Sequence, residues 1–201
     1  VTNTTESIYR IIYTGRIGTA NRQSINLFGQ TLGNTTIRER EIELDIFTKD
    51  FNEAALEPIR KMRNVKVYPS VPHDQIPCLL TKYDLLLLPL DFTSDGIRFA
   101  KYSLPTKAAE YMLTGKPILV FAPEETAVSK FFKEHECGYC LTNNSPDAIR
   151  SALFNLVTNK AYRDDIGKNA VKVAAEKFNA LKVRNRFREK LAKIAYSNDL
   201  I

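Results

Sequence analysis

The stretch KYSLPTKAAEYMLTGKPILVFAP, residues 101–123, decides the fold. It reads as a turn, a helix that begins near Pro105, and a buried strand over 116–122. Proline suits the first turn of a helix, where its missing N–H is not needed. Two opposite charges, Lys107 and Glu110, follow within the first two turns. Because this helix must also pack on a sheet, the two charges at one end call for an explanation.

The alternation of strand and helix continues on both sides of this stretch. Strands are expected over 8–15, 41–47, 65–69, 84–90, 116–122 and 138–142. The continuous apolar run DLLLLPL at 84–90 is typical of a central parallel strand that is covered on both faces. Strands that alternate with helices imply right-handed crossovers. The sequence therefore predicts an α/β fold, a doubly wound Rossmann-like sheet of six parallel strands in the order 3-2-1-4-5-6.

Helical patterns lie between and after these strands. The helix after the last strand should have Ser145 as N-cap and Pro146 at its first position. The segment DFTSDGIRFAKYS, residues 91–103, is predicted to be a loop. Two further helices are expected at about 160–178 and 180–196. Residues 1–178 should therefore form one domain, with a C-terminal helix over 179–201.

The composition indicates a soluble protein with a core. The chain has 201 residues, of which 44% are hydrophobic, enough to bury a sizeable core. Apolar runs are too short to span a membrane and the start, VTNTTESIYR, lacks a signal-peptide pattern, so we expect a cytoplasmic protein. The start also reads as a cut within something longer. The pair CGYC, with Cys137 and Cys140, stands without a second such pair, so neither a metal nor a redox site is expected.

The net charge of +6 is compatible with a phosphorylated small molecule, an anionic membrane or nucleic acid as partner. No aromatic-and-basic motif is present, so nucleic acid is not expected. The C-terminal helix has basic residues opposite an apolar stripe, formed by Ala180, Val183, Phe187, Leu191 and Ile194. We expect it to dock on something outside this segment; packing on its own domain and contact with a membrane surface are the alternatives.

Ligands of doubly wound sheets bind beyond the carboxyl ends of the strands, at the switch point in strand order. The loop TGRIGTANR after the first strand lies there. Gly15 permits close backbone approach, and Arg16 and Arg22 suit a diphosphate. The loop lacks the last glycine of the dinucleotide pattern G-x-G-x-x-G, because Asn21 stands there.

The helix near Pro105 belongs to the same edge. Free N–H groups, the helix dipole and Lys107 attract phosphate. The Glu110 carboxylate, one turn on, can accept hydrogen bonds from two vicinal ribose hydroxyls. Phosphate-binding groups followed by a ribose-binding carboxylate along one helix fit a nucleoside diphosphate. The alternative is an ordinary ion pair between Lys107 and Glu110, which would contribute a few tenths of a kcal/mol.

The segment YSLPTKAAEYMLTGKPILVFAPEE, residues 102–125, resembles the carboxyl-terminal, donor-binding domain of bacterial GT-B glycosyltransferases of group 1 or family 4. Weaker resemblances, in IIYTGRIG, VKVYPSVPHDQIPCLLTKYDLLLLPL and CGYCLTNNSPDAIRSAL, extend it along nearly the whole chain. It implies half of a GT-B fold, a nucleotide-sugar donor, and an acceptor-binding amino-terminal domain elsewhere in the protein. It also implies a role in bacterial surface polysaccharide synthesis, with the inner face of the membrane as a place of peripheral contact.

By this resemblance Glu110 binds the ribose, and the diphosphate contacts Gly15, Arg16, Arg22, Thr106 and Lys107. No metal or other cofactor is expected, because the basic groups neutralise the diphosphate. Tyr102 stands where many retaining members have the first Glu of Glu-x7-Glu, so a retaining mechanism is not implied.

Asp91, Glu124 and Glu125 follow the fourth and fifth predicted strands and are candidates for the donor sugar. A solvated loop and compensation of a helix dipole are the alternatives for these acids. His73 has no evident partner for base catalysis. Two other functions remain open, half of a nucleotide-sugar epimerase and a nucleotide-binding module without catalysis.

Overall fold

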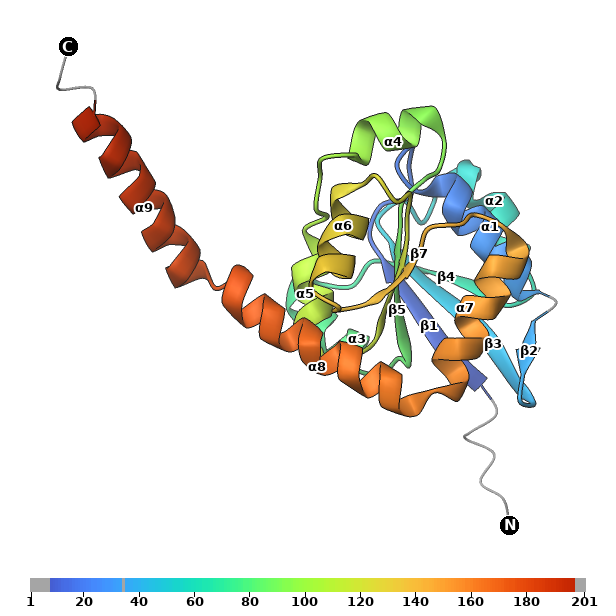
Figure 1. Ribbon diagram of the computed structural model, residues 1–201. Helices are drawn as coiled ribbons and strands as arrows, with labels where there is room; N and C mark the ends of the chain where they lie inside the picture. Colours follow the sequence, from blue (N-terminus) through green and yellow to red (C-terminus); the bar gives the residue numbers. More distant parts are fainter. Residues whose placement is uncertain (1–7, 34, 198–201) are drawn as a thin grey trace.

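The computed structural model describes residues 8–33 and 35–197, in which a central sheet lies between two layers of helices (Figure 1). The six parallel strands follow the order β4-β3-β1-β5-β6-β7, which is the predicted order 3-2-1-4-5-6. Their bounds are Ile8–Thr14 (β1), Arg40–Thr48 (β3), Val65–Pro69 (β4), Leu85–Pro89 (β5), Ile118–Phe121 (β6) and Tyr139–Leu141 (β7). The doubly wound α/β fold is therefore confirmed.

The described part of the sheet has a seventh strand that the sequence did not predict. Strand β2, Thr36–Ile37, pairs antiparallel with the start of β3. Arg38 and Glu39 form the turn between them with φ angles of 49° and 64°. Such turns favour glycine, asparagine or aspartate, because these residues tolerate positive φ. The hairpin was missed because its turn carries none of them.

The helices agree with most of the predicted ones, and Ser145 caps α7 by accepting a hydrogen bond from the Ala148 N–H. The main difference is α4, which lies within the predicted loop 91–103. The Thr93 hydroxyl caps α4 by accepting from the Gly96 N–H at 3.1 Å. The helices are α1 Arg22–Leu32, α2 Glu57–Arg60, α3 Ile76–Leu80, α4 Ser94–Ala100, α5 Lys107–Leu113, α6 Ala127–Glu134, α7 Pro146–Thr158, α8 Lys160–Lys177 and α9 Ala180–Ser197, with short 3-10 turns at Ala54–Leu56 and His73–Gln75.

The core has two halves, one on each face of the sheet. Strand β5 shows why: Leu85 and Leu87 pack on one face with α1 and α7, whereas Leu86 and Leu88 pack on the other with α5, α6 and α8. All four leucines are buried. A strand covered on both faces needs apolar side chains at every position, which explains the continuous apolar run in the sequence.

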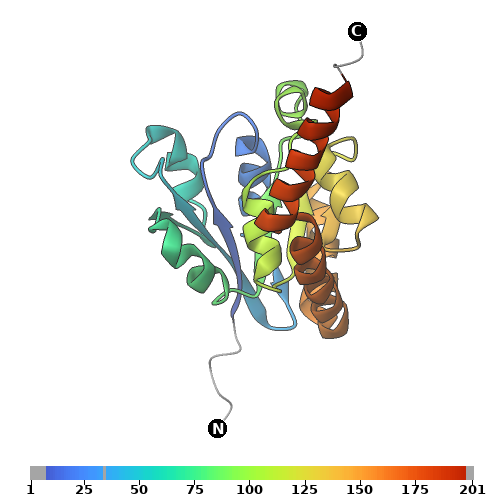
Figure 2. The ribbon, with the colours of Figure 1, turned by 90° about the vertical axis from the view of Figure 1, so that its left-hand side faces the viewer.

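Helix α9 continues from α8 away from the sheet (Figure 1), and Figure 2 looks at the molecule from the side on which α9 projects. Its apolar side chains are exposed, among them Leu181, Val183, Phe187 and Leu191 at 46–63%. Within residues 8–33 and 35–197, the structure contains no helix that is both long and apolar enough to cross a membrane.

Candidate functional site

A cavity of about 700 Å³ opens beyond the carboxyl ends of β1, β3 and β4. It is formed by the loops that follow these strands and by the first turns of α5. This is the edge of the sheet where ligands of doubly wound folds bind. The lining residues are Thr14, Gly15, Arg16, Phe47, Lys49, Ser70, Val71, Pro72, His73, Ile76, Thr106, Lys107 and Glu110. The structure therefore brings together five of the six residues predicted to bind the nucleotide diphosphate.

Gly15 lies in the β1–α1 loop, beside Lys107 of α5. Its φ of 132° is a conformation that side chains rarely adopt. A Cβ at this position would lie 2.3 Å from the Lys107 Nζ. The Gly15 N–H donates to the Phe47 carbonyl at 2.9 Å, which ties the loop to the end of β3. The backbone angle favours glycine here, and its missing Cβ leaves room for the end of the Lys107 side chain.

Lys107 begins α5 and turns back toward β1. Its Nζ donates to the Tyr13 hydroxyl at 2.9 Å and lies 4.1 Å from the centroid of the Tyr13 ring. Burial lowers the pKa of Lys107 to about 8, while the nearby Glu110 carboxylate opposes this shift. The ammonium therefore lies partly out of water, where an anionic ligand would be attracted more strongly than in bulk solvent.

Glu110 lies one helical turn further on and does not pair with Lys107. In the described chain its ion-pair partner is His73, whose Nε2 lies 3.7 Å from the Glu110 Oε1. Among these residues no ion pair joins Lys107 to Glu110, so the interpretation of the two charges as an ordinary ion pair is wrong. The Glu110 side chain is 37% exposed and open to the cavity.

The two predicted arginines have different surroundings. Arg16 lines the cavity with an exposed side chain, and its Nε donates to the Asp50 Oδ1 at 3.1 Å. Asp50 is buried and also accepts from the Ile17 N–H at 3.0 Å, so it ties the β1–α1 loop to the end of β3. Arg22, the first residue of α1, is not among the residues that line the described cavity. Its Nε is buried and has no hydrogen-bond partner within the described chain.

The acids proposed to contact the donor sugar lie elsewhere. Asp91 is buried, and its carboxylate accepts from the N–H groups of Gln23 and Ser24 at 3.2 and 2.7 Å. It therefore caps the start of α1. Glu124 is exposed and pairs with Lys133 at 2.7 Å, and Glu125 is exposed. None of these three acids is among the described residues that line the 700 Å³ cavity.

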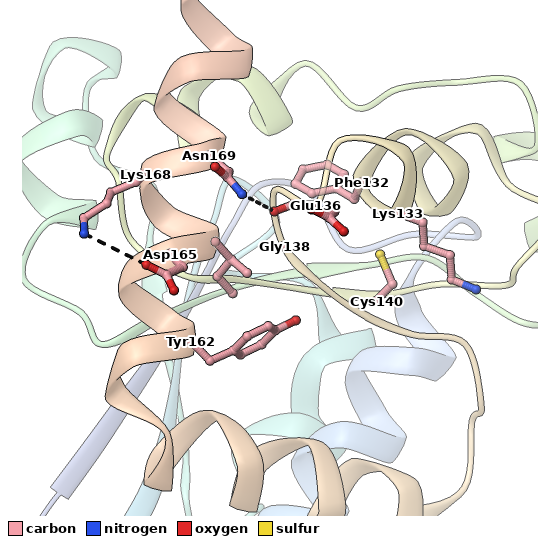
Figure 3. A pocket seen from close by; sticks show the side chains of 10 residues that line it. Phe132, Lys133, Glu136, Gly138, Cys140, Tyr162, Asp165, Lys168 and Asn169 are labelled. Carbon is pink, nitrogen blue, oxygen red and sulfur yellow. Dashed lines mark hydrogen bonds and ion pairs between the residues drawn. The ribbon is translucent and has the colours of Figure 1, made fainter.

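A second cavity, of about 650 Å³, lies between α6, β7 and α8 (Figure 3). Some of its polar groups contact other protein groups: Lys168 approaches Asp165 at 4.0 Å, and the Asn169 amide donates to the Glu136 carbonyl at 3.2 Å. Burial raises the pKa of the Cys140 thiol to about 11, so this thiol stays protonated. The first cavity lies beyond the carboxyl ends of the strands and is lined by Arg16, Lys107 and Glu110, so it is the better candidate for a binding site.

In the part of the chain that the structure describes, no three His, Cys, Asp or Glu side chains are grouped to hold a metal ion. The sequence missed Tyr13, Asn21 and Asp50, which organise the β1–α1 loop. Asp50 and the Tyr13–Lys107 contact gave no signal, because their partners are distant in sequence, and the local bonds of Asn21 to Tyr13 and Arg16 form no recognised motif.

Comparison with known proteins places the chain in a family. The family described as "Glycosyl transferases group 1" matches residues 8–159. Because this match covers most of the chain, the protein belongs to that family. No curated protein matches the chain.

Several solved structures share the fold. The Anabaena Alr3699/HepE structure, described as a complex with UDP and glucose, superposes with a TM-score of 0.69 at 16% identity, over 93% of this chain and 49% of that one. The C-terminal domain of the group 1 glycosyl transferase LpcC from Francisella tularensis gives 0.60 at 16% identity, over 86% and 87%. WaaG, a glycosyltransferase of lipopolysaccharide biosynthesis, gives 0.57 at 19% identity, over 84% and 43%. The chain thus spans about half of the HepE chain and most of the LpcC domain, and matches one half of a GT-B fold.

Proposed function

We propose that this chain is the donor-binding half of a glycosyltransferase and that the 700 Å³ cavity binds a nucleoside diphosphate sugar. The observation that carries the proposal is the order of charges on α5. A cation and a carboxylate lie one helical turn apart, line the same cavity and do not pair with each other. In a nucleoside diphosphate, the anionic phosphates lie next to the ribose hydroxyls, so they complement a cation followed by a carboxylate. The UDP named with the HepE structure is consistent with this ligand class.

Each residue has a role in this proposal. Lys107 and Arg16 contact the diphosphate, beside the open backbone at Gly15 and the Thr106 hydroxyl. The buried Nε of Arg22, which has no partner among the described residues, would gain one if the bound phosphate reached it, and this would remove the cost of an unsatisfied donor. Glu110 accepts from the ribose hydroxyls.

The chemistry that follows is transfer of the sugar to an acceptor hydroxyl. The acceptor oxygen bonds to the anomeric carbon, and the bond from that carbon to the diphosphate oxygen breaks. The electron pair leaves with the diphosphate, whose negative charge the cations stabilise. These cations serve in place of a metal. The proton of the acceptor hydroxyl must go to a base outside the donor contacts described here.

The acceptor would be held by an amino-terminal domain of the longer protein. Helix α9, with its exposed apolar side chains, would dock on that domain. The acceptor would be a glycan or a lipid-linked saccharide of a bacterial surface polysaccharide, and the enzyme would work in the cytoplasm with peripheral contact to the membrane.

Titration calorimetry of this chain with UDP and GDP tests the proposal. We expect saturable binding of at least one of them, and no multiple-turnover sugar transfer to saccharide or lipid-linked acceptors by this chain alone. Absence of binding to both diphosphates would refute the proposal. If the chain converts the sugar of a nucleoside diphosphate sugar without an acceptor, it would instead be half of an epimerase.

A further inference from the structure

The hydroxyl of Tyr13 connects the two sides of the proposed diphosphate site. It donates to the Arg16 carbonyl at 2.6 Å and accepts from the Asn21 amide at 2.7 Å. Its second lone pair accepts from the Lys107 Nζ at 2.9 Å. The proton and both lone pairs of this hydroxyl are therefore used. Tyr13 is fully buried at the end of β1, so the oxygen has a fixed position.

We propose that Tyr13 is a positioning residue, whose hydroxyl holds the β1–α1 loop and Lys107 in the relative geometry that receives the diphosphate. This role deepens the proposed function and rests on it. The loop presents Gly15 and Arg16, and α5 presents Lys107, so the two cations come from segments about 90 residues apart in the sequence. The hydroxyl joins these segments directly.

The surroundings of Lys107 make such a support necessary. Its ammonium lies against the Tyr13 ring and under Gly15, where burial disfavours the charged form. Glu110, which faces His73, is one turn away and forms no ion pair with Lys107 in the described chain. Arg16 is already paired with Asp50. The Tyr13 oxygen is thus the acceptor that keeps the ammonium at the edge of the cavity.

Burial raises the pKa of Tyr13, so its hydroxyl remains neutral. A neutral acceptor holds an ammonium without cancelling its charge. A carboxylate in the same place would neutralise Lys107 and reduce its attraction for phosphate. The choice of tyrosine therefore fits a residue that places a cation and leaves it free to act on a ligand.

A double-mutant cycle tests the role. Tyr13→Phe, Lys107→Met and the double variant are titrated with UDP, and their melting temperatures are measured. Tyr13→Phe keeps the ring but removes the hydroxyl and its bonds to Arg16, Asn21 and Lys107, so we expect about a tenfold loss of UDP affinity as the site loses its geometry. If Tyr13 acts mainly through Lys107, the same change should cost roughly threefold or less in the Lys107→Met background, because coupled residues are not additive.

Tyr83→Phe is the matched control. Tyr83 is also buried, its hydroxyl donates to the Asp45 Oδ2 at 2.6 Å, and neither residue is among those that line the described cavity. Removing this hydroxyl should lower the melting temperature to a similar degree but leave the UDP affinity unchanged. If Tyr13→Phe does not fold, Asn21→Ala removes one of the loop's bonds to the same hydroxyl and should weaken UDP severalfold.

The outcomes separate the two proposals. If the parent binds UDP and Tyr13→Phe binds it equally well, the positioning role is overturned and the proposed function stands. Equal losses in the presence and absence of Lys107 would also overturn it, because a general structural effect is additive. If the parent binds no nucleoside diphosphate, the proposed function fails, and the role of Tyr13 with it.

Discussion

Replacing Glu110 by alanine should weaken the binding of UDP about tenfold and leave the fold intact. In the chain without ligand, the Glu110 carboxylate has only a 3.7 Å approach to His73, which is longer than a hydrogen bond. Ribose hydroxyls would give it hydrogen bonds that it otherwise makes with water. The alanine variant loses these bonds and little else.

The size of the effect follows from the exposure of the carboxylate. A hydrogen bond to a charged group contributes roughly 1.5–3 kcal/mol. Because the Glu110 side chain is 37% exposed, water competes for it, and the lower end of that range applies. About 1.5 kcal/mol corresponds to about a tenfold change in the dissociation constant. The free energy of unfolding should change by no more than about 0.5 kcal/mol, as for other surface substitutions.

Titration calorimetry with UDP would compare the parent with Glu110→Ala and with Glu176→Ala. The Glu176 variant has the same change of net charge on the exposed face of α8 and should bind like the parent. A UDP analogue without the 2′ and 3′ hydroxyls should bind the parent about as weakly as UDP binds Glu110→Ala. Equal UDP affinity in the parent and Glu110→Ala would refute the ribose assignment.

Two further results are expected. The affinity for UDP should fall as the pH rises from about 8 to 9.5, because the pKa of Lys107 is lowered to about 8 and the ammonium is lost above it. The Lys107→Met variant should bind UDP weakly and show no such fall. A parent profile as flat as that of this variant would contradict the assignment of Lys107 to the diphosphate. Hydrogen exchange should show weaker protection over 181–193 of α9 than in β5, because the side chains there are exposed, and protection equal to that of β5 would show that α9 packs on its own domain.

The order and direction of the strands could be predicted because both follow from local patterns. Strands buried on both faces, such as β5 and β6, have continuous apolar sequences, and helices between them require parallel crossovers. The same rule locates the cavity at the carboxyl ends of the strands. Gly15, Arg16, Lys107 and Glu110 could therefore be expected at this edge, Thr106 was added by the family resemblance, and all five line one cavity; their contact with a ligand stays a prediction.

The differences between prediction and structure have two sources, a partner that is distant in sequence for Asp91 and a local capping signal for α4. Asp91 follows a strand and was assigned to the sugar, but it caps α1, whose N–H groups lie 67 and 68 residues earlier. The local pattern shows only an acid after a strand, and both roles have that pattern. Helix α4 was missed because DFTSDGIRFAKYS is rich in turn residues, and its Thr93 cap went unrecognised.

Gly15 and Lys107 show why a site of this kind must be considered as pairs of residues. Each alone has an ordinary explanation, since glycines are common in loops and lysines on helices. Together they form a contact that neither residue shows alone, because the Lys107 ammonium lies in the space left by the missing Cβ of Gly15. A lysine on the surface keeps its charged form in water, where no desolvation opposes it. Lys107 instead lies where burial lowers its pKa, and a position that disfavours its own charge is explained best by an anion that restores it.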